Sequence, residues 1–263
     1  MRVKRLLAGL AVAALAVVAA GCGKDPLEIP PEGPTAEWDK AYGPYADNPR
    51  GVLILIHGGG WKGIDRNQFN VTREQGEIYT RMGFMTMTID YRAGADGLKD
   101  VERFYKQARK RVGKDVPICA VGSSAGGHLA LMLAAREPSL DCAVSIAGPT
   151  NLAGLADQEG GEQTYKIASD AFGEENLEKL SPVLHADKIK AKIFVAGADN
   201  DPLMPVDQLK DIEKAVPGTK TVVLPAGESP WVHSAVEPSA KKRMNQELSE
   251  FLNAVAPLPS PAA

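Results

Sequence analysis

Gly122-Ser123-Ser124-Ala125-Gly126 is the stretch of sequence that decides the fold. It follows an apolar run at 117–121, typical of a buried strand, and precedes a helix-compatible run at 125–136. A serine hydroxyl becomes a useful nucleophile when a tight strand-to-helix turn holds it near a base and beside backbone N–H groups. Gly122 and Gly126 lack the Cβ atoms that such a turn would crowd. The pattern alone is common, but its flanking strand and helix make Ser124 a candidate nucleophile.

Two other segments supply what a serine nucleophile needs. An apolar run at 52–56 leads into His57-Gly58-Gly59-Gly60-Trp61. Successive glycines let backbone amides approach a ligand closely, as an oxyanion hole requires. A second run at 191–196 leads into Gly197-Ala198-Asp199-Asn200-Asp201, and His233 follows later. The chain order is serine, acid, histidine, which is the order of α/β hydrolases.

Short apolar runs alternate with amphipathic ones along most of the chain. This alternation predicts an α/β fold, with a mostly parallel central sheet, helices on both faces and a small or absent cap. Active sites on such sheets lie at the carboxyl ends of strands, where each candidate segment falls. We interpret 148–185 as the small cap, with a short helix at 162–171. Strands are expected at 52–56, 84–90, 117–121, 142–147, 192–196 and 220–224, and helices at 70–82, 99–113, 125–136, 206–215 and 236–254.

The sequence contains four histidines, and the base follows by elimination. His57 precedes the glycines and is typical of a residue that braces such a loop. His128 comes one helical turn after Ser124 and should face the core. His185 precedes the acid-bearing strand, where the base does not belong in this fold. The predicted base is therefore His233, after the last strand.

Four motifs together resemble α/β-hydrolase carboxylesterases: the hormone-sensitive-lipase-like esterases, bacterial acetyl-xylan and feruloyl esterases, and kynurenine formamidases. They are His-Gly-Gly-Gly-Trp at 57–61, Asp-Tyr-Arg at 90–92, Gly-Ser-Ser-Ala-Gly-Gly-His-Leu-Ala at 122–130 and Asp-Pro-Leu-Met-Pro at 201–205. The similarity of spacing covers residues 50–255. It is specific for the fold and the catalytic machinery and unspecific for the substrate.

The resemblance implies roles for individual residues. Turn chemistry alone leaves both Asp199 and Asp201 open as the acid. In the resembling families the acid is the aspartate followed by Pro-Leu, which implies Asp201. The implied catalytic residues are Ser124, Asp201 and His233, and the implied oxyanion donors are the N–H groups of Gly59, Gly60 and Ala125. Two alternatives stay open for Trp61 and Trp231: they either line a substrate pocket or belong to the core. A structural ion-pair role is expected for the Asp-Tyr-Arg motif at 90–92.

We therefore expect a serine hydrolase that cleaves carboxylic esters of short acyl groups, with a small-molecule or carbohydrate ester as its substrate. Such chemistry needs no cofactor and no metal, and no cysteine, histidine and carboxylate cluster has the spacing of metal ligands. Two alternatives stay open: an amidase, formamidase or peptidase with the same residues, and an envelope-binding protein without turnover. The formal net charge of −3 offers no electrostatic footprint for nucleic acid.

The beginning of the chain predicts export. Arg2, Lys4 and Arg5 precede an apolar stretch at 6–20 that is short for a membrane span, so residues 1–21 are predicted to be a signal peptide. The run Ala19-Ala20-Gly21-Cys22 resembles a bacterial lipobox, in which Cys22 is lipidated and becomes the mature N-terminus. We expect a lipoprotein anchored to a membrane of the cell envelope. A plain signal peptide with an incidental Cys22 is the alternative.

Composition sets the remaining boundaries. Residues 22–49 are predicted to be the lipidated cysteine and a Pro-rich tether, 50–256 the catalytic domain, and 257–263 a tail. Cys119 and Cys142 fall in neighbouring predicted strands. We expect them to be buried free thiols, because neighbouring parallel strands seldom suit a disulfide.

Overall fold

The computed structural model describes residues 33–39, 41–42, 48–224, 233 and 238–258, without the side chains of 238–241. The fold described below belongs to the unit formed by residues 32–263. Cys22, Trp231 and the predicted signal peptide lie outside the described residues. Within the described part of the chain, no helix combines the length and the apolar character needed to cross a membrane.

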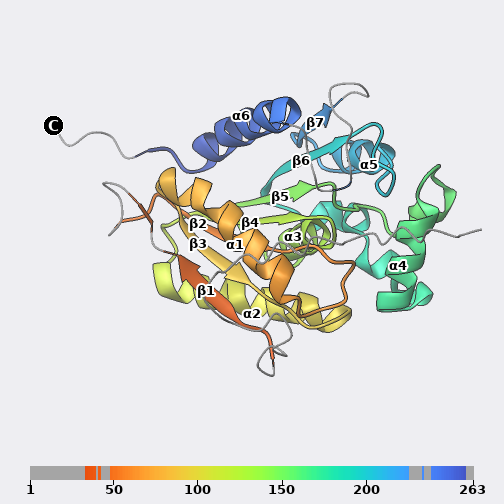
Figure 1. The fold of residues 1–263 in the computed structure, drawn as a ribbon, viewed down its shortest axis with the longest axis horizontal. Coiled ribbons are helices and arrows are strands. Elements are labelled where there is room, and N and C mark those ends of the chain that lie inside the picture. The colour runs from red at the N-terminus through yellow and green to blue at the C-terminus, as the bar shows by residue number, and fades with distance from the viewer. Residues whose placement is uncertain (1–32, 40, 43–47, 225–232, 234–237, 259–263) are drawn as a thin grey trace, which may run out of the picture. The chain divides into compact units, whose positions relative to one another are not determined.

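Strands and helices alternate through this unit (Figure 1). The strands are β1 Ala36–Asp39, β2 Val52–Ile56, β3 Met85–Ile89, β4 Ile118–Ser123, β5 Cys142–Ile146, β6 Lys192–Ala198 and β7 Lys220–Leu224. The α-helices are α1 Arg66–Arg81, α2 Ala95–Val112, α3 Ala125–Arg136, α4 Glu162–Phe172, α5 Asp207–Ala215 and α6 Pro238–Val255. Short 3₁₀ turns lie at Ala153–Asp157, Glu174–Asn176, Glu178–Leu180 and Pro182–Lys188.

The seven strands form one sheet in the order β1-β3-β2-β4-β5-β6-β7. Strands β2 to β7 pair in parallel, and β1 pairs antiparallel with β3 at the edge. Every residue of β2 is buried, as are the first five residues of β4. Strands that are apolar along their whole length belong to a sheet covered on both faces. The predicted α/β fold with a mostly parallel sheet is confirmed.

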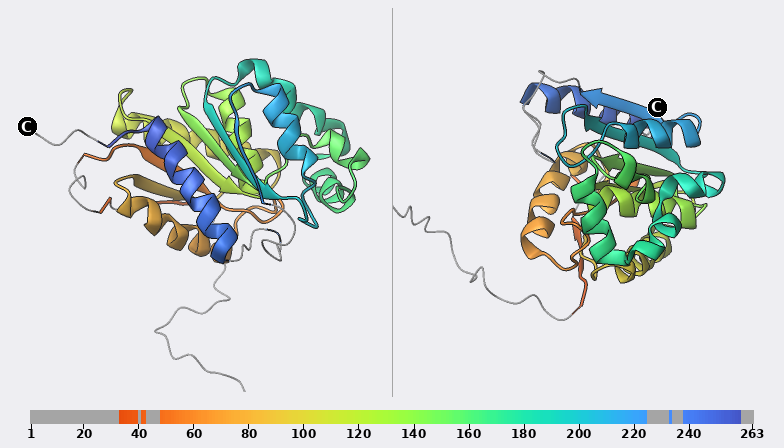
Figure 2. Two further views of the ribbon diagram at one scale, coloured as in Figure 1. Left: turned by 90° about the horizontal axis from the view of Figure 1, so that it is seen from above. Right: turned by 90° about the vertical axis from the view of Figure 1, so that its right-hand side faces the viewer.

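Helices cover the sheet from both sides. Leu53, Leu55 and Val121 point to one face and pack in a cluster with Leu248 and Leu252 of α6, and α1 lies on the same side. The other face packs against α2, α3 and α5 in a second, larger cluster. Figure 2 shows orange α1 and blue α6 together on one side of the sheet. Parallel strands thus end at a common rim, and the loops after β2, β4, β5 and β6 meet there.

The sheet begins earlier than the sequence predicted. The range 22–49 was expected to be a tether, but residues 36–39 within it form β1, whose backbone pairs with β3. Trp38 of β1 packs against the larger core cluster, and the Arg111 guanidinium lies 4.6 Å from its ring centre. A four-residue edge strand with a half-exposed, charged sequence carries little periodic signal, which is why the pattern missed it.

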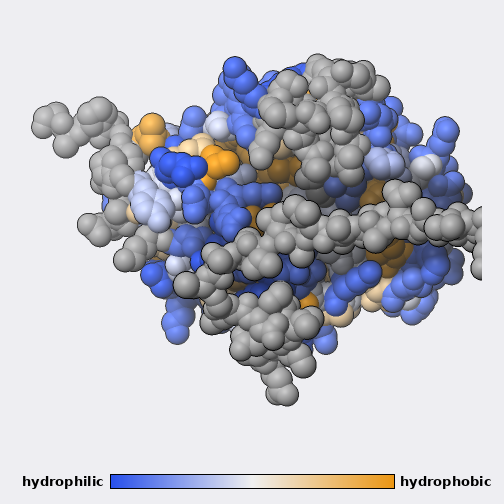
Figure 3. Space-filling view, in the orientation of Figure 1, coloured by the Kyte–Doolittle hydropathy of each residue, from blue (hydrophilic) through white to orange (hydrophobic). Residues whose placement is uncertain are grey.

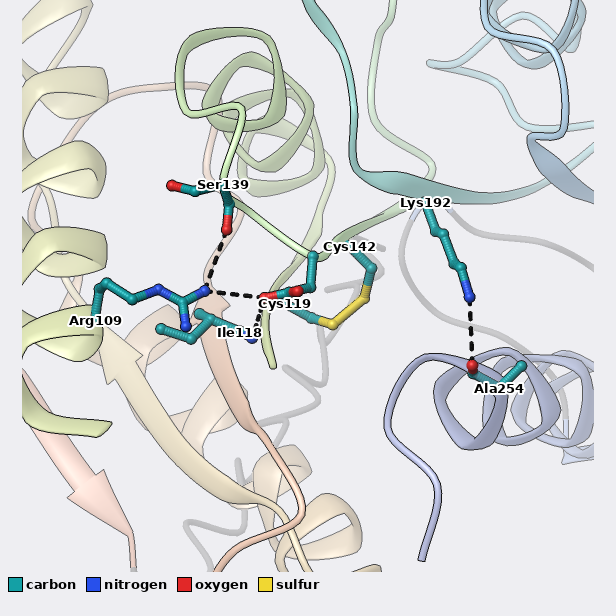
Figure 4. The surroundings of a disulfide bond; sticks show 8 residues. Arg109, Ile118, Cys119, Ser139, Cys142, Lys192 and Ala254 are labelled. Atoms are coloured by element: carbon teal, nitrogen blue, oxygen red, sulfur yellow. Dashed lines mark hydrogen bonds and ion pairs between the residues drawn. A yellow bond between two sulfur atoms is a disulfide. The ribbon is translucent and has the colours of Figure 1, made fainter. Parts of the chain in front are cut away.

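The cysteine prediction was wrong. Cys119 and Cys142 form a disulfide, with their Cα atoms 4.5 Å apart. The two residues are direct partners in the β4–β5 register, and both point into the cluster beneath α6. In-register partners on the same face bring their Cβ atoms close enough for a bridge. The bond (Figure 4) lies near the amino ends of the two strands, whereas Ser124 follows the carboxyl end of β4.

A small cap lies between β5 and β6. It consists of the 3₁₀ turns and α4, which spans nearly the residues predicted for the cap helix. Exposed side chains in this region are mainly polar, and hydrophilic residues cover most of the described surface visible in Figure 3. The cap is thus small, and its helix α4 lies beside the carboxyl ends of the strands.

Candidate active site

Ser124 lies on the predicted strand-to-helix turn, between β4 and α3. Its backbone adopts φ 52° and ψ −125°, a conformation that costs energy for a residue with a Cβ atom. A Cβ on Gly122 would lie 2.3 Å from the Gly126 carbonyl, and a Cβ on Gly126 would lie 2.2 Å from the Ile56 carbonyl. Neither position tolerates a side chain. The two glycines let the turn pack closely enough to hold the serine side chain at the rim.

His233 and Asp201 lie in line with the serine. The His233 Nε2 atom is 2.8 Å from the Ser124 Oγ, and its Nδ1 atom is 3.1 Å from the nearer carboxylate oxygen of Asp201. The side chain of Asp201 is buried, whereas 15% of the His233 side chain is exposed. This arrangement can pass a proton from the hydroxyl to the imidazole, while the carboxylate holds the ring in orientation.

The structure distinguishes the two candidate acids. Asp201 Oδ1 accepts hydrogen bonds from the N–H groups of Leu203 (2.9 Å) and Met204 (3.1 Å), which aim the carboxylate at His233. Asp199, by contrast, is exposed, and its backbone N–H pairs with the Leu224 carbonyl of β7. Turn-forming residues follow both aspartates in the sequence, and the structure shows that the Asp-Pro-Leu-Met turn orients the Asp201 carboxylate.

The glycine loop after β2 lies beside the serine. Within the described part of the chain, the N–H groups of Gly59 and Gly60 have no hydrogen-bond partner. Ala125 is the first residue of α3, so the helix itself leaves its N–H unused. Three amides from two separate segments are therefore available around Ser124, which is what an oxyanion hole needs.

His57 and Asp90 support the loop from below. Both side chains are fully buried, and the His57 Nε2 atom lies 2.9 Å from an Asp90 oxygen. The Tyr91 ring stacks on His57, and its hydroxyl donates to the carbonyls of His57 and Gly58. Burial is the largest cause that raises the pKa of Tyr91, so this hydroxyl remains a donor. Arg92, the last residue of the motif, pairs instead with Asp100 of α2.

Ser124 and His233 line a pocket of about 460 Å³. Its walls come from the glycine loop, from Thr164 and Ile167 of α4, and from Leu203, Met204 and Pro149. A larger hollow of about 620 Å³ adjoins it past Gly60, Trp61 and Ile167, but that hollow contains none of Ser124, His233 and Asp201. Of these two hollows, only the smaller one is lined by both the Ser124 hydroxyl group and the His233 imidazole. The contribution of α4 could not be read from the sequence.

The remaining predicted site residues differ in where they lie. Trp61 meets both expectations: it is 2% exposed and its ring packs against His128 and Phe172 in the core, and the residue also lines the pocket that contains Ser124. His128 is fully buried, as expected, and His185 lies in the cap with its Nε2 2.9 Å from the Lys179 carbonyl. Among the described residues, no group of three or more histidine, cysteine and carboxylate side chains is placed to hold a metal ion.

Comparison with known proteins identifies the family of this chain. The BD-FAE family model matches residues 41–216, more than half of the chain. The protein belongs to the BD-FAE family. The matched range contains the glycine loop, the Ser124 turn and Asp201, and it ends before His233. One curated relative and several solved structures match more of the chain than this range.

One curated relative of this BD-FAE member is dipeptidyl aminopeptidase BIII of Pseudoxanthomonas mexicana, which is 24% identical over 79% of this chain. The chain spans only 33% of that enzyme's length. Thermogutta terrifontis esterase 2, solved phosphonylated by sarin, superimposes with a TM-score of 0.64 at 21% identity, covering 87% of this chain and 92% of its own. An acetyl ester-xyloside bifunctional hydrolase from Caldicellulosiruptor lactoaceticus gives 0.64 at 18% identity, covering 84% and 86%. These likenesses establish the α/β-hydrolase fold.

Proposed function

We propose that this BD-FAE member is a serine hydrolase that cleaves carboxylic esters of short acyl groups. One observation carries the proposal: the Ser124 hydroxyl lies 2.8 Å from the His233 imidazole, which is itself 3.1 Å from the Asp201 carboxylate. An acyl-transfer site requires a serine, an imidazole and a buried carboxylate in this order, beside unused backbone amides. All of these groups are present here.

The reaction follows from these positions. Ser124 Oγ attacks the ester carbonyl carbon, and its proton moves to His233 Nε2. The carbonyl oxygen becomes an oxyanion, which the N–H groups of Gly59, Gly60 and Ala125 stabilise. The intermediate then collapses as His233 returns the proton to the departing alcohol, leaving an acyl-serine. Water, deprotonated by the same histidine, hydrolyses the acyl-serine and restores Ser124.

The pocket supports a short acyl group. Its volume of about 460 Å³ is shared by both halves of the substrate, and the adjacent cap is too small to enclose a long chain. A carbohydrate acetyl ester has this form, and the acetyl ester-xyloside hydrolase from Caldicellulosiruptor has the same fold. We propose acetylated carbohydrate as the substrate class on this analogy.

Turnover of p-nitrophenyl acetate, butyrate and octanoate by the wild-type protein and by Ser124→Ala tests the proposal. Alanine also carries a Cβ atom, so the left-handed turn is equally strained in both proteins and folding should be unaffected. We expect turnover that declines with acyl length and is abolished by the substitution, together with loss of labelling by a fluorophosphonate probe. Turnover that rises toward octanoate would refute the short-acyl part alone.

Peptide or amide hydrolysis is the second candidate, because the curated relative is an aminopeptidase. The match to that enzyme covers a third of its length, so determinants of peptide specificity elsewhere in its chain are not carried over. Matched ester and anilide substrates of the same acyl group decide between the two. No Ser124-dependent turnover of either would favour the envelope-binding alternative, which tight binding to a cell-wall component would support.

We further propose that the protein is exported and lipid-anchored through Cys22. The Cys119–Cys142 disulfide supports export, because disulfides persist mainly in oxidising compartments. The full chain should partition with membranes when expressed in a bacterium, and Cys22→Ala should release it. Membrane association that survives this substitution would contradict the lipid anchor.

A further inference from the structure

The two halves of the oxyanion hole come from different segments. Gly59 and Gly60 belong to the loop after β2, whereas Ala125 begins α3. An oxyanion is stabilised only when donors from both segments lie about 3 Å from one point. Something must therefore fix the loop against the helix.

A hydrogen bond between two buried side chains makes this connection. The Trp61 indole N–H donates to His128 Nδ1 at 3.1 Å, and the two rings meet edge to face with centroids 5.3 Å apart. Trp61 directly follows Gly60, and His128 lies one turn after Ser124, donating its backbone N–H to the Ser124 carbonyl. The bond joins the two donor segments by a short path.

The protonation of His128 is fixed by its partners. An indole nitrogen can only donate, so Nδ1 must be the unprotonated acceptor. Nε2 lies 2.6 Å from the Leu180 carbonyl, which can only accept, so Nε2 carries the proton. The ring is neutral, and burial lowers the pKa of His128 to about 4. The same ring thus reaches Trp61 on one side and the cap on the other.

Trp61 also holds the loop through its backbone. It adopts φ 55°, which a bulky residue avoids unless its surroundings impose it. Its carbonyl accepts a hydrogen bond from Gly94 N–H at 3.0 Å, and its ring packs against Phe172 of α4. Ring, indole N–H and carbonyl together hold the residue in this conformation.

We infer that Trp61 and His128 are positioning residues that set the distance between the glycine-loop amides and the Ala125 amide. Their side chains bond neither to the Ser124 hydroxyl nor to the His233 ring, and their effect passes through the backbone, where His128 N–H donates to the Ser124 carbonyl. The inference rests on the proposed hydrolase function. Because the oxyanion forms only after attack, loosening this pair should lower kcat and leave KM nearly unchanged.

Three single variants and one double variant test the pair. Trp61→Phe keeps an aromatic ring and removes the indole donor. His128→Leu removes the acceptor, while His128→Asn keeps an oxygen near the position of Nδ1. We expect Trp61→Phe and His128→Leu to lower kcat for p-nitrophenyl acetate about 10- to 100-fold, with KM within twofold, and His128→Asn to retain kcat within about fivefold. The double variant Trp61→Phe/His128→Leu should be no slower than His128→Leu, because both remove the same bond.

Tyr105→Phe is the matched control, since it keeps the aromatic ring and removes a hydroxyl that bonds to Ser139 and interacts with Arg109, in another part of the same core. It should lower the free energy of unfolding without changing kcat. Unchanged kcat in Trp61→Phe and His128→Leu, additive losses in the double variant, or an equal loss in Tyr105→Phe would each overturn the inference. Absence of Ser124-dependent turnover in the wild type would instead refute the proposed function, so the two failures are distinguishable.

Discussion

Strand β4 connects two regions of opposite character. At its carboxyl end lies the Ser124 turn, and the non-glycine residues with positive φ in the described part of the chain all gather at this rim: Trp61, Ser124 and Ala147. At its amino end the backbone is ordinary, and cross-links accumulate instead. Strain at one end of a strand can persist only when the surrounding structure resists relaxation.

The cross-links at the amino end are covalent and polar. The Cys119–Cys142 disulfide joins β4 to β5 (Figure 4). Asp141 accepts hydrogen bonds from the Ile118 N–H at 2.8 Å and from Arg109 at 2.9 Å. On the same side, Lys192 Nζ donates to the Ala254 carbonyl near the end of α6. The comparison predicts that substitutions at the rim change rates, while substitutions at the amino end change stability.

The largest effect is expected from Asp201→Asn. Its amide can present a donor to His233, which favours the wrong tautomer and cannot stabilise the imidazolium. We expect kcat to fall about 10³- to 10⁴-fold with little loss of stability. Asp199→Asn is the matched control, and because Asp199 is exposed and does not contact His233, its kcat should stay within twofold. A large loss in Asp199→Asn with a small one in Asp201→Asn would reverse the assignment of the acid.

Removing the disulfide at the amino end of β4 should lower the free energy of unfolding. The bridge closes a loop with a sequence separation of 23 residues, for which chain entropy predicts a stabilisation of about 3 kcal/mol. Chemical denaturation of Cys119→Ala/Cys142→Ala should show this loss in the free energy of unfolding. At temperatures where both proteins are folded, kcat should be unchanged within twofold. A lower kcat in the variant without the disulfide would show that the amino end of β4 affects the geometry of the Ser124 turn.

His128 should make stability depend on pH. Its pKa is about 4 in the folded protein, lowered chiefly by burial and also by the charge of Arg136, against 6.5 in the unfolded chain. The unfolded state therefore binds the proton first, so stability falls as pH drops from 6.5 toward 4. The expected loss between pH 7 and pH 5 is about 2 kcal/mol. Denaturation of His128→Asn should lack this part of the pH slope, whereas His185→Asn should keep it.

The features of the fold and site that depend on local sequence patterns could be predicted from the sequence. Continuous apolar strands alternating with helices predict the sheet, and the positions of Ser124 and His233 follow from the strand ends. Features set by contacts distant in sequence could not be predicted. The β4–β5 register decides the disulfide, and the bond from Trp61 to His128 joins residues 67 positions apart. The choice of Asp201 over Asp199 needed a family resemblance, because both lie in one turn and only three-dimensional geometry separates them.

The smallest effect is expected from Arg109→Gln, at the amino end. Arg109 donates to the carbonyls of Gly113, Val116 and Ser139 and pairs with Asp141, so it ties the end of α2 to the starts of β4 and β5. Part of the side chain is exposed, which limits the expected loss in unfolding free energy to about 1 kcal/mol.

Lys166→Gln is the control for Arg109→Gln, because its pair with Asp170 is largely exposed and should contribute nothing measurable. Denaturation curves and kcat should be measured on both variants. If Arg109→Gln lowers stability and leaves kcat unchanged, the strained rim tolerates small losses at the opposite end, since the disulfide still fixes β4 against β5. If kcat falls instead, the polar contacts of Arg109 help to fix the position of the Ser124 turn, and the disulfide alone is not sufficient for this.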